Sequence, residues 1–222
     1  MNYDLYETKA SSCPTFLEMI GFSSYQIIAA TLQPLLLSII LFLGPIVQYT
    51  IEGRNILNPS FWMDKDVILT VRALVIAPIT EEIVYRGCMF PLLYSAFGTT
   101  AILLCPLLFG LAHLHHFFEW FKDEDNFLTF KIAMTTLKRT VLEVCIHTCI
   151  TFIFGIYSTF LFWRTSNIIS PIVCHVFCNG IGPPPIHRIS STRGSSCIIY
   201  AYIIGLVMFI LLLLPLTNMY NT

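Results

Sequence analysis

Three ionisable side chains fall within six residues of an otherwise apolar stretch. Glu81, Glu82 and Arg86 lie inside the segment from Val67 to Phe97, whose composition is typical of a membrane span. A charged side chain at the centre of a membrane helix costs roughly 2.5–3.5 kcal/mol on insertion scales. We therefore expect this cluster to be paired, hydrated or used in a reaction.

Helical spacing separates the two glutamates. Glu82 and Arg86 are four residues apart on one face, with the carboxylate N-terminal to the guanidinium, the favourable order for an ion pair. Glu81 is rotated by about 100° from Glu82 and stacks over Tyr85, so no cation lies in helical register with it. A carboxylate in a low-dielectric, imperfectly paired site is more basic than one in water, as a general base near neutral pH must be. Glu81 is the candidate base; the alternative is a packed polar network without chemistry.

Histidines gather near the end of the next apolar segment. His113 lies one helical turn beyond Phe109 and deep in the apolar run, where its imidazole can share a water molecule with the candidate base and take up or release a proton. His115 and His116 approach a charged loop, and we assign them to the membrane interface. His147 stands alone on another apolar face, and we assign it to packing.

A further histidine is followed one helical turn later by an amide. His175 and Asn179 are four residues apart, so the imidazole and the carboxamide lie on the same helix face. Two such donors can converge on one developing oxyanion. Either residue alone could satisfy a backbone carbonyl, but the pair, just ahead of the helix-ending run 180–185, favours an oxyanion hole.

These elements together match a hydrolase that forms no covalent intermediate. A carboxylate-activated water, an orienting histidine and a His/Asn oxyanion hole would hydrolyse a peptide bond. The residues also resemble the three signature motifs of the type II CAAX prenyl endopeptidases, the Ras-converting enzymes: E-E-x-x-x-R at residues 81–86, F-x-x-x-H at 109–113 and H-x-x-x-N at 175–179. The resemblance covers roughly residues 77–216. It is closer to the eukaryotic enzymes than to their bacterial self-immunity and abortive-infection relatives.

The resemblance implies an activity, a substrate class and a location. It implies a multi-pass protease of the endoplasmic reticulum membrane that removes the last three residues from CaaX proteins with a farnesylated or geranylgeranylated cysteine, such as Ras-type small GTPases. It assigns water activation to Glu81 and His113, the oxyanion hole to His175 and Asn179, and support of the site to Glu82 and Arg86. Members of the family are regarded as glutamate proteases that require no metal, so no cofactor is implied.

The composition of the chain indicates that the candidate site residues lie on membrane helices. The 222-residue chain is 56% hydrophobic and 11% charged, whereas a soluble domain is typically about 25% charged. The formal net charge of −1 and the absence of a clustered basic face give no reason to expect a nucleic-acid partner. We predict an all-α polytopic membrane protein, a bundle of about six to eight transmembrane helices that encloses an intramembrane catalytic cavity.

About six apolar segments approach the roughly 20 residues that a bilayer core requires. They run over residues 27–49, 67–97, 99–118, 141–163, 167–182 and 197–216. Pro78 predicts that the second segment is kinked or divided into two shorter helices. We expect a polar N-terminal segment at 1–26, a first span and loop at 27–66, and a catalytic core at 67–222. One apolar segment before the core is fewer than the family usually has.

Basic residues predict the topology. With six spans, most basic loop residues fall on one side, and the positive-inside rule makes that side cytoplasmic. They are Arg54, Lys65, Lys122, Lys131, Lys138, Arg139, Arg188 and Arg193. We therefore expect a site that is accessible from the cytosol, while the prenyl group enters laterally from the membrane lipid. Each buried CH₂ of that group contributes about 0.8 kcal/mol to its anchoring.

Two alternatives stay open from the sequence. Glu81, His113 and His175 could converge as zinc ligands with Asn179 nearby, as in His/carboxylate sites, although the chain lacks H-E-x-x-H. A proton- or ion-coupled transporter could use the same buried Glu, His and Arg residues. The transporter predicts repeated halves with matching broken helices, and the sequence contains no visible repeat.

Overall fold

The computed structural model describes residues 21, 27–63, 66–115, 117 and 130–217. Most of the described residues are helical and none of them lies in a strand, which confirms the all-α class. Apart from Gly21, the expected polar segment 1–26 lies outside the described residues, as do Lys65, His116 and Lys122.

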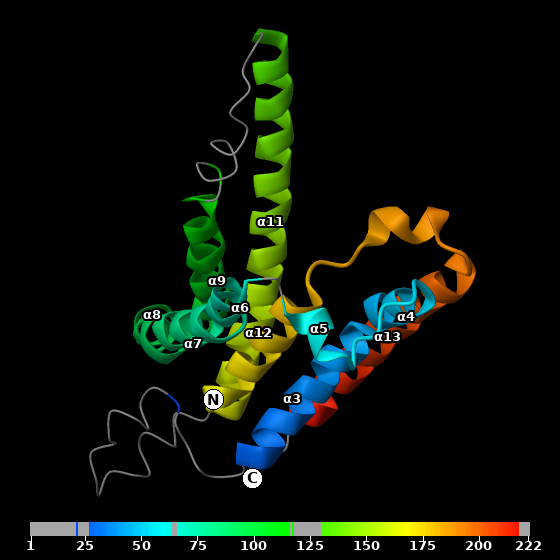
Figure 1. Ribbon diagram of the computed structural model, residues 1–222. Helices are drawn as coiled ribbons and strands as arrows, with labels where there is room; N and C mark the ends of the chain where they lie inside the picture. The colour runs from blue at the N-terminus through cyan, green and yellow to red at the C-terminus, as the bar shows by residue number, and fades with distance from the viewer. Residues whose placement is uncertain (1–20, 22–26, 64–65, 116, 118–129, 218–222) are drawn as a thin grey trace, which may run out of the picture. The chain divides into compact units, whose positions relative to one another are not determined.

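Every apolar segment of the sequence contains a helix (Figure 1). The first holds α3 (Ile27–Leu41) and α4 (Leu43–Ile51), and the short α5 (Pro59–Trp62) follows it. The second holds α6 (Val67–Val71), η1 (Arg72–Ile76), α7 (Ala77–Glu82), η2 (Ile83–Met89) and α8 (Phe90–Phe97). The third holds η3 (Gly98–Thr100), α9 (Ala101–Ala112) and η4 (His113–His115). The rest hold α11 (Phe130–Thr165), α12 (Ile169–Ile181), η5 (Ile186–Ser191) and α13 (Ser195–Thr217).

Among the residues that the structure describes, three helical runs are long and apolar enough to cross a membrane: Val67–His115, Met134–Thr165 and Ser195–Thr217. The pair α3 and α4, bent by 57°, adds a fourth if it counts as one span. For the described residues this is fewer than the six to eight transmembrane helices predicted, because the second and third segments continue as one run of 49 residues and α12 has only 13 residues. Many large apolar side chains on these runs are exposed, including Ile68, Leu92, Ile153 and Leu211, as expected for helices that face lipid.

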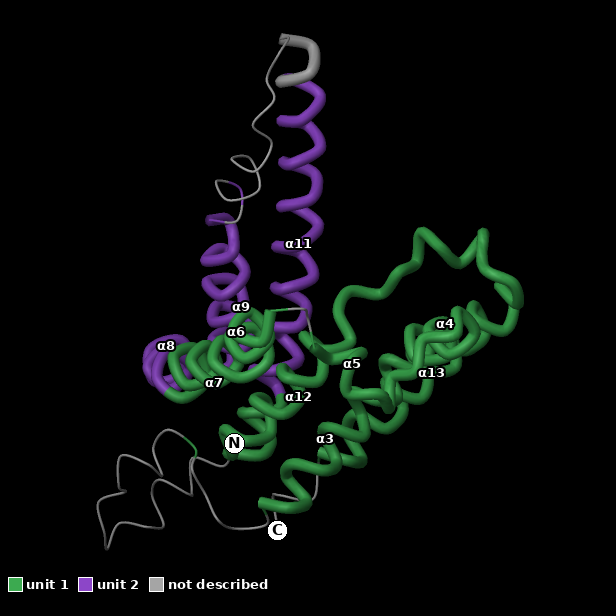
Figure 2. Tube along the Cα trace, in the orientation of Figure 1, with its two compact units in different colours: residues 1–87, 161–222 green, residues 88–160 purple. Residues whose placement is uncertain are grey.

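The chain forms two compact units (Figure 2). Unit 1 comprises Met1–Gly87 and Leu161–Thr222, and unit 2 comprises Cys88–Phe160. In unit 1, α13 lies along α3 and α4, while α12 packs against α3, η1 and α7. Gly205 permits the close approach of α13 to α3, because a Cβ there would lie 2.6 Å from the carbonyl oxygen of Ile40. Small residues allow membrane helices to approach in this way.

Side-chain hydrogen bonds fix α4 against the segment between α12 and α13. Gln48 Nε2 donates to the carbonyl oxygen of Pro185 at 3.1 Å, and the hydroxyl of Tyr202 donates to Gln48 Oε1 at 3.2 Å. Glu52 and Arg188 form an ion pair at 3.3 Å. These contacts join three separate parts of unit 1 around the buried Gln48.

The second segment remains helical through Pro78 but changes its winding. Asp66 caps its start, since Oδ1 accepts the backbone N–H of Ile68 at 2.8 Å. Turns of π-helix at η1 and η2 flank α7, and Pro78 lies in the first turn of α7. A proline in a first turn sacrifices little hydrogen bonding, and a π-turn ahead of it accommodates the missing donor. Contrary to the expectation from the sequence, the helix is therefore not divided at Pro78. Instead it widens into π-helical turns, η1 and η2, on either side of the glutamates.

In unit 2, α9 packs against α11. A Cβ on Gly155 would lie 3.0 Å from Cβ of Pro106, and one on Gly110 would lie 3.2 Å from Cβ of Phe152. Both glycines therefore serve close helix contact. This packing positions η4, at the end of α9, beside the middle of α11.

Candidate active site

Glu82 and Arg86 form the ion pair that their spacing predicts. Arg86 Nη1 donates to Glu82 Oε1 at 3.3 Å, and Arg86 Nε lies 3.3 Å from Glu82 Oε2. Both side chains have 0% exposure. Removing one partner of a buried pair leaves an uncompensated charge, so each of these residues depends on the other. The ion pair is confirmed; its role in supporting a reaction stays a prediction.

His175 joins this cluster from α12. Its Nδ1 lies 2.8 Å from Glu82 Oε1, and its Nε2 lies 3.8 Å from Glu81 Oε2. An ionised carboxylate only accepts hydrogen bonds, so the Nδ1 atom carries the proton of the contact with Glu82. In a neutral ring Nε2 then holds the lone pair, whereas a doubly protonated ring directs an N–H toward Glu81. The contact with Glu82 thus fixes which nitrogen faces the second glutamate.

The two neighbouring glutamates occupy different environments. The side chain of Glu82 is fully buried between Arg86 and His175, whereas that of Glu81 is 31% exposed. Glu81 is therefore the carboxylate that water can reach. This difference agrees with the separation of the two residues on the helix surface that the sequence indicates.

Asn179 lies one turn beyond His175 on α12 and is held by a backbone carbonyl. Its Nδ2 donates to the carbonyl oxygen of Ala73, in the π-helical turn η1, at 3.1 Å. A carboxamide nitrogen carries two protons, so this bond uses one and fixes the orientation of the amide. Sequence reasoning missed Ala73 because its contribution is a backbone atom, which no residue type signals.

His113 lies in unit 2, at the start of η4. Its Nδ1 lies 2.8 Å from the carbonyl oxygen of Phe109. A carbonyl only accepts, so Nδ1 carries a proton and, in the neutral ring, Nε2 holds the lone pair. The ring centroid of His113 is 5.7 Å from that of His147 on α11, so the histidine assigned to packing is a ring neighbour of His113.

The structure gathers five of the six predicted site residues within unit 1. They are Glu81, Glu82, Arg86, His175 and Asn179, while His113 belongs to unit 2. Within the part of the chain that the structure describes, no group of three or more His, Cys, Asp or Glu side chains is arranged to hold a metal ion. Of the three residues considered as zinc ligands, only Glu81 and His175 lie in the same unit.

Comparison with known proteins identifies the family. Residues 63–181 match the model of the family described as type II CAAX prenyl endopeptidase Rce1-like. The chain is 35% identical to CAAX prenyl protease 2 of Homo sapiens over 214 residues, which cover 92% of this chain and 62% of the human protein. It is 41% identical to CAAX prenyl protease 2 of Arabidopsis thaliana over 154 residues, which cover 68% of this chain and 45% of the plant protein. The chain thus spans between 45% and 62% of the length of these two relatives.

No solved structure matches the chain. The family match, however, includes every residue from Glu81 to Asn179, and therefore all three motifs, together with the whole of unit 2 and part of unit 1. The chain belongs to the Rce1-like family of type II CAAX prenyl endopeptidases.

Proposed function

We propose that this chain is an intramembrane endopeptidase that removes the C-terminal tripeptide from prenylated CaaX proteins. Membership of the family supports the reaction class. The observation that carries the proposal is the pairing of a water-accessible carboxylate, Glu81, with His175, whose ring is fixed by the buried Glu82–Arg86 pair. Hydrolysis by an activated water requires such a base beside a positioned proton donor or acceptor.

Glu81 is the proposed general base. It takes a proton from a water molecule, and the resulting hydroxide adds to the carbonyl carbon of the prenylated cysteine. When the tetrahedral intermediate collapses, the C–N bond breaks and the leaving amine takes the proton back from Glu81. His113 is assigned to orient the same water on the family resemblance, and its contact with Phe109, which leaves the lone pair of the neutral ring on Nε2, supports that role.

His175 and Asn179 are proposed to stabilise the oxyanion. Asn179 donates one amide proton to the carbonyl oxygen of Ala73, and its second amide proton is assigned to the oxyanion of the substrate. His175 can donate from Nε2 only when the ring carries both protons, because its Nδ1 proton is bound to Glu82. The carboxylates of Glu81 and Glu82 then balance the positive charges of His175 and Arg86. As Glu81 becomes neutral on taking the water proton, the His175 cation faces the new negative charge on the oxyanion.

The proposed substrates are farnesylated or geranylgeranylated CaaX proteins, including Ras-type small GTPases. The proposed location is the endoplasmic reticulum membrane, with the site accessible from the cytosol. The apolar helical runs of the chain support a place in the membrane, and the relatives' name, CAAX prenyl protease 2, supports the substrate class. A prenyl group holds its protein at the bilayer by about 0.8 kcal/mol per buried CH₂, so a protease in the membrane meets this substrate where it is concentrated.

Cleavage of defined peptides by the purified full chain in lipid vesicles tests the proposal. We expect release of the tripeptide from a farnesylated CaaX peptide, no release from the unprenylated peptide, and no effect of a chelator. Glu81→Gln should remove activity while its melting temperature stays close to that of the wild type, because the side chain is partly exposed.

Each outcome of this assay decides one point. Failure of the wild type to cleave the farnesylated peptide would overturn the proposed function. Wild-type activity in Glu81→Gln would overturn the base assignment alone. Loss of activity with a chelator, restored by zinc, would establish the zinc-dependent form of the protease.

A further inference from the structure

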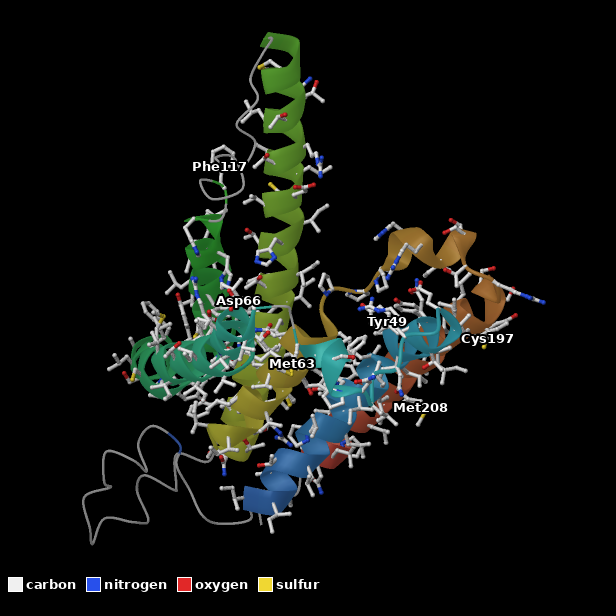
Figure 3. The ribbon with its side chains drawn as sticks, viewed as in Figure 1. Tyr49, Met63, Asp66, Phe117, Cys197 and Met208 are labelled. Atoms are coloured by element: carbon white, nitrogen blue, oxygen red, sulfur yellow. The ribbon has the colours of Figure 1, made fainter. Side chains whose placement is uncertain are left out.

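We infer that a small apolar pocket beside Asn179 binds one aliphatic side chain of the leaving tripeptide. This inference rests on the proposed function and adds a subsite to it. The pocket lies within unit 1 and has a volume of about 190 Å³. It is lined by Trp62, Leu69, Thr70, Ala73, Leu74, Asn179 and Gly180. Figure 3 labels Met63 and Asp66, which stand at the two ends of the short connection between α5 and α6.

The pocket lies beside the amide of Asn179, the proposed oxyanion donor. Asn179 and Ala73 both line it, and the hydrogen bond between them at 3.1 Å is the one that orients the proposed oxyanion donor. An extended peptide advances about 3.3 Å per residue. In the proposed orientation the leaving strand runs from Asn179 toward α6, so the first one or two side chains after the cleaved bond lie within about 3–7 Å of that residue, beside the pocket.

The lining selects for an apolar side chain. The side chains of Leu69, Leu74 and Ala73 are hydrocarbon, and no charged side chain is among the described residues of the lining. The hydroxyl of Thr70 donates its proton to the carbonyl oxygen of Asp66 at 3.1 Å. The indole N–H of Trp62 is likewise donated to the carbonyl oxygen of Ile56 at 2.7 Å. Against the hydrocarbon side chains of Leu69, Ala73 and Leu74 a polar substrate group would lose its water without gaining a partner, which is unfavourable, and the second amide proton of Asn179 is assigned to the oxyanion.

The volume distinguishes a side chain from the isoprenoid chain. Pockets that enclose whole small-molecule ligands usually measure about 300–1,000 Å³, and this pocket measures about 190 Å³. It accommodates one branched aliphatic side chain. We therefore assign the pocket to a side chain and not to the prenyl group.

The Trp62 wall of the pocket is held in place by aromatic packing and by the α12 backbone. A Cβ on Gly180 would lie 2.3 Å from Cε3 and Cζ3 of Trp62, so the indole ring rests directly on the α12 backbone. The ring also contacts Phe61 and Phe177, with centroid separations of 5.6 and 6.3 Å. A preformed apolar pocket discriminates between side chains that differ by one methylene by about 10–200-fold in kcat/KM.

Two substitutions change the pocket in opposite directions. Ala73→Leu fills it while keeping the carbonyl that holds Asn179, and Leu69→Ala enlarges it. We propose to measure kcat/KM of the full chain in vesicles for farnesylated peptides with alanine, isoleucine or phenylalanine at each of the two aliphatic CaaX positions. At the position that uses the pocket, Ala73→Leu should lower the isoleucine-to-alanine preference by about 10-fold or more, and Leu69→Ala should raise the phenylalanine-to-isoleucine ratio by a similar factor.

The matched control is Ile68→Ala, which removes an aliphatic side chain from the same helix outside the pocket. Ile68 is 78% exposed, and its substitution should leave both ratios unchanged. If Ala73→Leu does not fold, the phenylalanine-to-isoleucine ratio of Leu69→Ala still tests the subsite.

Four results would overturn the subsite. Unchanged ratios in the variants, or an equal loss for every peptide, would reject it while the protease activity of the wild type still stands. A change in the preference between farnesyl and geranylgeranyl, with peptide ratios constant, would mean that the pocket holds the lipid. Absence of cleavage by the wild type would remove the proposed function and the subsite together.

Discussion

The Nδ1 atom of His175 lies 2.8 Å from Oε1 of Glu82, a residue 93 positions earlier in the chain. The carboxylate of Glu82 also accepts a hydrogen bond from Arg86 and forms an ion pair with it. One buried side chain therefore neutralises a guanidinium and orients the imidazole that faces Glu81. Glu82 thus links the stability of the charge cluster to the geometry of the candidate site.

Replacing Glu82 with glutamine should affect both stability and activity. Arg86 would keep its buried charge without a carboxylate, and breaking a buried pair costs about 3–5 kcal/mol. The surviving protein should show a reduced kcat with little change in KM, because His175 loses the charged acceptor that holds its ring. Thermal unfolding in detergent and cleavage kinetics measure the two effects. The assignment fails if both values match the wild type.

A second ion pair in this chain provides the control for that experiment. Arg139 and Glu143 have the same i,i+4 spacing and a separation of 2.8 Å, but their side chains are 69% and 47% exposed. Exposed pairs contribute less than about 1 kcal/mol. Glu143→Gln should therefore leave the melting temperature and kcat almost unchanged, so that burial, and not spacing, accounts for the effect at Glu82.

Removing both buried charges should separate stability from activity. The double variant Glu82→Gln/Arg86→Met leaves no uncompensated charge, so its loss of unfolding free energy should be well below the sum of the losses in the two single variants. Its activity should stay low, because His175 still lacks its carboxylate. A double variant whose destabilisation equals that sum, or one with full activity, would contradict this interpretation.

Asn179→Ala distinguishes an oxyanion donor from a structural amide. Loss of one oxyanion donor typically lowers kcat by about 10²–10³-fold, whereas loss of the bond to Ala73 should cost about 1 kcal/mol of stability. We expect the large kcat effect with KM changed only a few-fold. If kcat persists and only the melting temperature falls, the amide serves only to hold α12 against η1.

Gly180→Ala should destabilise unit 1 through Trp62. The added methyl would lie 2.3 Å from the indole ring, and overpacking of this kind typically costs about 1–3 kcal/mol. The double variant Gly180→Ala/Trp62→Leu removes the indole ring with which the new methyl would clash. Its loss of unfolding free energy should therefore be smaller than the sum of the losses in the two single variants. Melting temperatures of the four proteins complete the cycle, and strict additivity would exclude the contact.

Local patterns accounted for the helices and for one ion pair. Apolar segments of sufficient length became helices, because a membrane helix satisfies its own backbone hydrogen bonds within the segment. The spacing of Glu82 and Arg86 predicted their contact because it depends on one helical turn. The π-helical turns around α7 had no comparable signal, since Pro78 indicated a disturbance but not its form.

Long-range contacts account for what the sequence did not reveal. The contact of His175 with Glu82 depends on how α12 packs against α7, which no spacing within either segment encodes. The contact of Asn179 with Ala73 involves a backbone carbonyl, so residue types could not indicate it. The pocket combines residues from α5, α6, η1 and α12 and becomes visible only when these elements are in place.

The shared carboxylate of Glu82 also sets an order for the maturation of the protein during synthesis. The Glu82–Arg86 pair is local, so it can form as soon as its own helix exists. His175 is translated 93 residues after Glu82, a delay of roughly 5–20 s at ordinary elongation rates. A nascent chain therefore holds a neutralised pair before its histidine arrives, and the site is completed only after α12 has left the ribosome.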